Sequence, residues 1–145
     1  MIGAPMRRLE LLLRFNAAGL SPDAVRRMLR AAAAEDILES RPEDLSVWGE
    51  VSLQSASHFS ERARAFDVAA ELASAGSSGV DIVDFEDARY PHLLKTVPDA
   101  PLVLYVRGAD ALTSAPGSVI AIVGSRRPTP YALRMARPLA GQAAA

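Results

Sequence analysis

The sequence predicts an α/β protein that is helical over residues 1–79 and begins a parallel sheet within residues 80–145. Apolar residues in the first part recur at the three- and four-residue spacing of amphipathic helices. The run Gly-Ser-Ser-Gly at 76–79 then indicates a linker. Beyond it the apolar runs are short and typical of strands, and the continuous run at 119–123 has the pattern of a strand buried on both faces. We therefore place a domain boundary near residue 79.

Two helices and a turn are expected at the start of the chain. An apolar stripe from Leu9 to Ala17 predicts the first helix, and Gly19 is a plausible C-terminal glycine. Ser21 is a typical N-cap, with Pro22 at the first position of the second helix. Together these two helices have the outline of a helix-hairpin-helix, but the turn lacks the second glycine with which such hairpins hold DNA phosphates. We expect a packing or interaction module, although a DNA contact by Arg26, Arg27 and Arg30 stays open.

Two further helical elements precede the linker. Arg41-Pro42 opens a short one, and a long helix capped by Ser57 is expected from about residue 58 to 75. Aromatic side chains in these elements occur at helical spacings and are expected in the core: Trp48, Phe59 and Phe66.

After the linker, residues 80–84 and 102–106 predict two strands, and Pro91 starts a short helical turn between them. The buried run 119–123 predicts a third strand, and a helix is expected from residue 131 to about 139. Tyr90 and Tyr105 are expected to be mostly core.

Composition excludes several classes of protein. Half of the 145 residues are hydrophobic and 23% are charged, which predicts a folded chain. There is no cysteine, and His58 and His92 are the only histidines, so neither a metal site nor a disulfide is expected. No apolar run approaches the roughly 20 residues of a membrane span, and no signal peptide is evident, so we expect a cytoplasmic protein. No catalytic constellation surrounds either histidine, so we expect neither an enzyme nor a cofactor.

The net charge of −1 conceals a basic end. Residues 118–145 hold four arginines and no acid, which favours an anionic partner. Here the run 119–123 is followed by Gly-Ser-Arg-Arg-Pro-Thr-Pro and a helix start, the arrangement with which open α/β sheets hold phosphates. The alternative is an ordinary strand-to-helix turn with solvated arginines. The candidate residues for binding DNA or phosphate are Gly124, Ser125, Arg126, Arg127, Thr129 and Arg134.

Three blocks, at 87–94, 99–108 and 120–131, resemble the DNA-processing protein A (DprA/Smf) family. The last contains Gly124-Ser125-Arg126, the GSR motif of that family. The resemblance implies an extended Rossmann-like domain, preceded by a SAM-like or helix-hairpin-helix-like accessory module. It also implies binding of single-stranded DNA, its delivery to the RecA recombinase in natural transformation, and a homodimer in the full-length family. In that family the GSR arginine lies in the DNA-binding pocket, a role that would fall to Arg126.

The chain departs from the family pattern in two respects. Ala132 stands where the family usually has glycine. The family also continues well beyond this point, so we expect the chain to end early in the Rossmann-like domain, without the RecA surface. Two alternatives stay open: a nucleotide-handling relative of the phosphoribohydrolases, and a truncated product without activity of its own.

Overall fold

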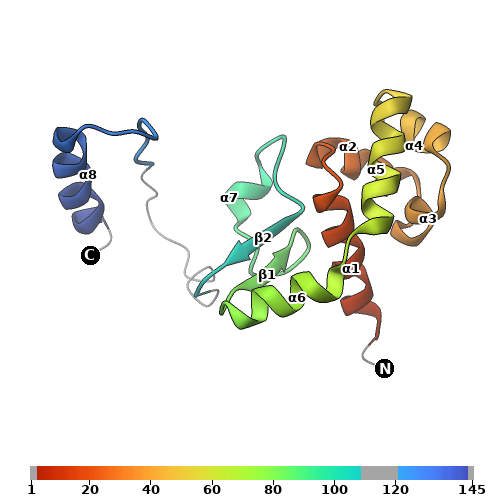
Figure 1. Ribbon diagram of the computed structural model, residues 1–145, viewed down its shortest axis with the longest axis horizontal. Coiled ribbons are helices and arrows are strands. Elements are labelled where there is room, and N and C mark those ends of the chain that lie inside the picture. The colour runs from red at the N-terminus through yellow and green to blue at the C-terminus, as the bar shows by residue number, and fades with distance from the viewer. Residues whose placement is uncertain (1–2, 109–120, 144–145) are drawn as a thin grey trace. The chain divides into compact units, whose positions relative to one another are not determined.

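The computed structural model describes residues 3–108 and 121–143, which belong to two compact units, residues 1–113 and 114–145 (Figure 1). The described part of the first unit contains the helices α1 (Gly3–Ala17), α2 (Pro22–Ala31), α3 (Ala34–Glu39), α4 (Pro42–Gly49), α5 (Leu53–Ala65), α6 (Val68–Ser77) and α7 (His92–Lys95), and the strands β1 (Asp81–Asp84) and β2 (Val103–Val106). The described part of the second unit contains α8 (Pro130–Ala143). This mixture of helices with a small sheet agrees with the α/β class, while the SAM-like and Rossmann-like details stay predictions.

The predicted helix boundaries at the first turn are confirmed. The hydroxyl of Ser21 accepts a hydrogen bond from the backbone N–H of Ala24 at 3.2 Å, and Pro22 opens α2. Gly19 has a φ of 87°, in the left-handed region that glycine adopts without strain. The helix α3, in contrast, was not expected from the sequence, since no side chain caps its start.

The core of the first unit lies among α1, α2, α4 and α5. The rings of Phe15 and Phe59 lie 5.5 Å apart between their centroids, and both side chains are buried. Trp48 and Phe66 are partly buried and pack against this cluster, so the expected core role of these aromatic residues is confirmed. Other large, fully buried side chains complete the core: Leu13, Val25, Met28, Ile37 and Leu45.

The prediction of one long helix over 58–75 is wrong, because two helices occupy this stretch and its neighbours. Ser52 rather than Ser57 caps α5, accepting from the N–H of Ser55 at 3.1 Å. The chain then leaves the helix at Phe66, and the carboxylate of Asp67 caps α6 by accepting from the N–H of Ala70 at 3.0 Å. A capping carboxylate stabilises a helix start within the apolar stripe and so divides it.

Arg14 of α1 holds the end of α5 at this break. Its guanidinium Nη1 donates to the carbonyl oxygens of Ala63, Arg64 and Phe66 at 3.1, 3.2 and 2.9 Å. The last carbonyls of a helix have no partner within the helix and carry partial negative charge. A cation from another helix therefore fixes where α5 ends.

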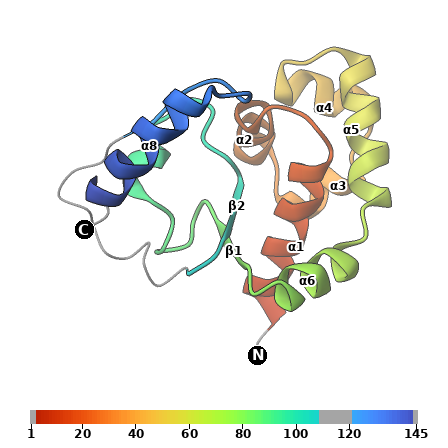
Figure 2. The ribbon, with the colours of Figure 1, turned by 60° about the vertical axis from the view of Figure 1, so that its left-hand side comes forward.

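The predicted strands are confirmed as β1 and β2, which pair antiparallel with Asp81 opposite Val106. The views in Figures 1 and 2 place this sheet beside α6 and α1. Leu102 and Val103 are buried in the same cluster as the leucines of α1. Because the sheet in the described part of the chain is antiparallel, the parallel sheet stays a prediction, as does the domain boundary near residue 79.

The tyrosines divide between core and surface. Tyr90 is buried, and its hydroxyl donates to the carbonyl oxygen of Pro101 at 2.8 Å. Tyr105 on β2 is 46% exposed, so its expected place in the core is wrong. Alternation along the strand does not explain this exposure, since it places Tyr105 on the same face as the buried Val103.

The expected buried strand at 119–123 is not formed by those of its residues that the structure describes. Residues 121–123 have no strand assignment, and Val123 is 90% exposed. Residues 119 and 120 lie outside the described residues. A strand buried on both faces needs hydrogen-bonded neighbours and covering helices, and no described residue pairs with this segment. The following helix is confirmed and is longer than expected, continuing through Pro138.

Candidate nucleic-acid interface

The predicted phosphate-binding residues form a polar loop that leads into α8. The hydroxyl of Ser125 accepts from the backbone N–H of Arg127 at 3.1 Å, and this contact closes a tight turn around Arg126. Thr129 then caps the helix: its hydroxyl oxygen accepts from the N–H of Ala132 at 3.2 Å. Both hydroxyl contacts are local, which explains how a short sequence motif shapes this loop.

The basic side chains of the loop and helix are open to solvent. Arg126, Arg127 and Arg134 are all exposed, and none of them forms an ion pair within the described residues. Gly124 has no heavy atom within 4 Å of the position that a Cβ would take. The backbone and the guanidinium groups are therefore accessible to an anion.

The helix brings one further residue to this region. Tyr131 lies in the first turn of α8 and is 64% exposed. Residues three apart are neighbours on a helix surface, so Tyr131 and Arg134 share a face. The sequence analysis did not include Tyr131 among the candidates, although proteins that bind single strands combine a basic groove with aromatic side chains on which bases stack.

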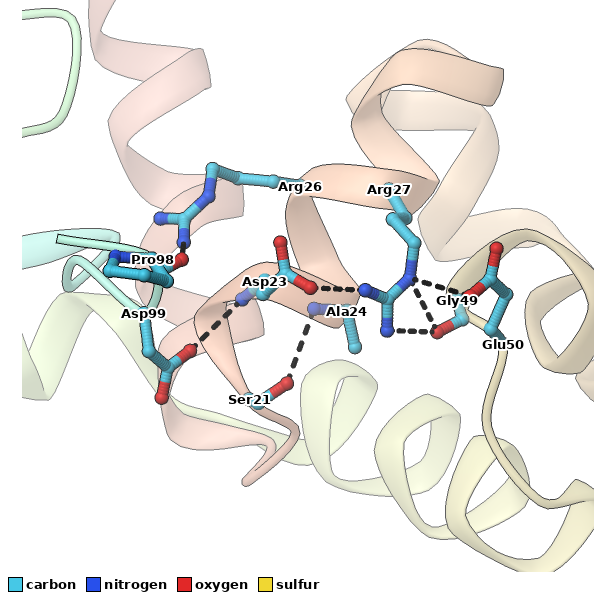
Figure 3. A network of polar contacts seen from close by, with 9 residues as sticks. All are labelled: Ser21, Asp23, Ala24, Arg26, Arg27, Gly49, Glu50, Pro98 and Asp99. Atoms are coloured by element: carbon cyan, nitrogen blue, oxygen red, sulfur yellow. Dashed lines mark hydrogen bonds and ion pairs between the residues drawn. The ribbon is translucent and has the colours of Figure 1, made fainter. Parts of the chain in front are cut away.

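Two arginines of α2, Arg26 and Arg27, have a different role (Figure 3). Arg26 donates to the carbonyl oxygens of Pro98 and Ala100, and its guanidinium lies 5.4 Å from the centroid of the Phe85 ring. A carboxylate oxygen of Asp99 in turn accepts from the N–H of Asp23 at 3.2 Å. These contacts attach α2 to the segment before β2 and favour the packing interpretation of the helical hairpin.

Arg27 connects α2 to the end of α4. It donates to the carbonyl oxygen of Gly49 through Nε at 3.1 Å and Nη2 at 2.9 Å, and it pairs with Asp23 and with Glu50 (Figure 3). A guanidinium engaged in this way is not available to a ligand. Arg30, one turn further, has no such partner within the described part of the chain.

Two further findings concern only the residues that the structure describes. Among them, no three His, Asp or Glu side chains gather in a group that could hold a metal ion. None of the described helices has the length and apolar character needed to cross a bilayer.

Comparison with known proteins finds similarity in residues 81–145. The family described as DNA recombination-mediator protein A matches residues 81–145, from β1 to the end of the chain. DNA processing protein DprA of Bacillus subtilis (strain 168) is 38% identical over 60 residues, which are 41% of this chain and 20% of that protein. The chain thus spans about a fifth of the length of this curated relative. No solved structure matches. Residues 81–145 are therefore similar to the DNA recombination-mediator protein A family and to part of a DprA protein.

Proposed function

We propose that this protein binds single-stranded DNA through the loop 124–129 and the first turns of α8, and that it acts in DNA processing during recombination. The observation that carries the proposal is the group of exposed arginines in this loop and helix, which form no ion pair with any residue that the structure describes. They lie within a segment of the chain that matches the family. The described residues there contain no acidic side chain that would repel a phosphate.

Each group in the loop has a role that follows from its chemistry. The guanidiniums of Arg126 and Arg127 donate paired hydrogen bonds to phosphate oxygens. Gly124 lets the phosphodiester approach the backbone closely, and Ser125 keeps the turn closed. The ring of Tyr131 offers a flat apolar face on which a base stacks. The start of α8 adds the partial positive charge of a helix N-terminus.

The biological setting follows from the resemblance to the family. We propose delivery of the bound strand to the RecA recombinase in natural transformation, a homodimeric state, a cytoplasmic location, and a role without catalysis. These proposals concern the whole protein, of which the matched segment is a part.

The test is a titration of fluorescently labelled oligothymidine with the protein at several salt concentrations. For single strands, the logarithm of the binding constant falls with the logarithm of the salt concentration with a slope of about −0.7 for each phosphate contact. We expect Arg126→Ala to weaken binding and to make this slope shallower by about 0.7. The matched control is Arg41→Ala, because the Arg41 side chain is 78% exposed and lies far from the loop in sequence.

Two results would contradict the proposal in different ways. Unchanged affinity in Arg126→Ala, with strong binding by the wild-type protein, would remove the loop as the site. A flat dependence on salt would mean that no phosphate is contacted, and the proposed function would then be wrong.

A further inference from the structure

The first unit contains a groove with an apolar floor between α1 and α2. One pocket of about 240 Å³ is lined by Leu12, Leu29 and Leu102, with Phe85 at one side. A second pocket of about 260 Å³ shares Leu12 and Leu29 with the first and extends to Ala34. Because the two pockets share lining residues, they lie side by side and form one elongated groove.

Basic side chains surround this floor. Arg8, Arg26 and Arg30 line the first pocket, and Glu86 is its one acidic lining residue. This charge differs from that of the surrounding chain, since residues 1–117 hold 12 basic and 17 acidic side chains. The second pocket adds Glu35, so three arginines and two glutamates line the groove as a whole. The groove thus has an excess of one positive charge on an acidic unit, which favours an acidic ligand.

The arginines differ in their availability. Arg26 is engaged with two backbone carbonyls and with the Phe85 ring. Arg8 pairs with Glu86 at 3.6 Å, but the two side chains are 53% and 63% exposed, and exposed pairs of this kind contribute little. Arg30 is exposed and has no partner in the described part of the chain. Arg30 is thus free for an incoming carboxylate, and Arg8 can exchange Glu86 for one.

The shape and the aromatic contacts indicate the class of ligand. The two adjoining pockets, of about 240 and 260 Å³, form an elongated groove, a shape that suits an extended segment of polypeptide with successive side chains. A base of nucleic acid would need a free aromatic face. The Phe85 ring is already occupied by other groups of the chain. The guanidinium of Arg26 lies 5.4 Å and the ammonium of Lys95 5.2 Å from its centroid, and the centroid of the Tyr90 ring lies at 5.2 Å.

We propose that this groove binds a short acidic segment of another protein. An apolar side chain of the segment enters the leucine-lined pocket, and an adjacent carboxylate pairs with Arg30 and Arg8. Recognition by an apolar anchor beside a charged contact is common in peptide-binding grooves. This site uses residues of the first unit alone and is independent of the proposed DNA contact at Arg126.

The experiment measures binding of a labelled synthetic peptide, in which aspartate alternates with leucine and phenylalanine, to the full chain by fluorescence anisotropy. Two control peptides carry lysine in place of aspartate, or serine in place of the apolar residues. We expect Arg30→Glu to weaken binding at least about tenfold, as the loss of a charge-assisted contact implies. The matched variant Arg41→Glu makes the same change of charge outside the groove and should alter binding less than about twofold.

Amide NMR spectra locate the bound peptide, and we expect shifted resonances at Leu12, Leu29 and Arg30. Three results would overturn the proposal: no binding of the acidic peptide, equal loss in Arg30→Glu and Arg41→Glu, or equal binding of the serine peptide. If unlabelled oligothymidine displaces the peptide and its own binding depends on Arg30, the groove is a nucleic-acid site instead.

Discussion

Replacing Leu102 by alanine should destabilise the helices of the first unit, although Leu102 lies outside all of them. Its side chain is 2% exposed, one residue before β2, and belongs to the same buried cluster as Leu11 and Leu12 of α1. The segment just before it is also attached to α2 through Arg26. The helices and the strand segment should therefore unfold in one transition.

The magnitude follows from the surroundings of Leu102. Truncating a buried leucine to alanine costs about 2–5 kcal/mol, depending on how far the site relaxes. Leu102 also lines the groove between α1 and α2, so neighbouring side chains can move into the space. We expect the lower half of the range, about 2–3 kcal/mol. With a urea m-value of about 1–3 kcal/mol per molar, the midpoint should fall by roughly 0.7–3 M.

The assay is urea unfolding followed by the fluorescence of Trp48, the single tryptophan, which lies in α4 and packs against the core. The control is Leu93→Ala, because Leu93 is 66% exposed and its loss should change stability by less than about 0.5 kcal/mol. A wild-type midpoint at Trp48 in Leu102→Ala would refute the shared core. It would support independent folding on the two sides of residue 79.

Two further predictions concern contacts that the structure assigns to stability. Arg14→Ala should lower the free energy of unfolding by about 2–3 kcal/mol, because three carbonyls at the end of α5 lose their charged donor; a melting temperature within a degree of wild type would contradict this. Burial raises the pKa of Tyr90, and partial burial with the nearby Glu71 raises the pKa of Tyr105 to about 12. The unfolded chain ionises both phenols near 10.0, so stability present below that pH should be lost as the pH rises toward 12. Between these pH values, the denaturant midpoint should fall less steeply with rising pH in Tyr90→Phe and in Tyr105→Phe than in the wild-type protein. Equal slopes in the variants and the wild-type protein would count against the raised pKa values.

Features set by neighbouring residues could be predicted from the sequence. Ser21 and Pro22 mark the start of α2 because a cap and a fixed φ act within one turn. The hydroxyl of Thr129 likewise caps α8 through a contact three residues along the chain. The candidate loop was therefore accessible to sequence analysis, since its shape depends on contacts between residues two or three apart.

Features set by distant residues could not be predicted. The apolar stripe continues past Phe66, and only the cap at Asp67 together with Arg14 from another helix divides it. The strand predicted at 119–123 is likewise not formed by residues 121–123. Its pattern shows which surroundings would suit a strand, but strand pairing depends on partners elsewhere in the chain, and residues 121–123 have none among the described residues.

The roles of the arginines show why charge counts alone do not locate a binding site. Arg14, Arg26 and Arg27 carry the same charge as Arg126, but their guanidiniums are bound to backbone carbonyls, so an added anion would have to displace those contacts. Arg126 and its neighbours have no such contacts within the described residues, so an anion bound there would displace none. Removing an arginine of the first kind should therefore lower stability, and removing one of the second kind should lower affinity while leaving stability unchanged. Measuring stability and affinity together therefore distinguishes arginines that support the fold from arginines that are available to DNA, which a count of charges cannot do.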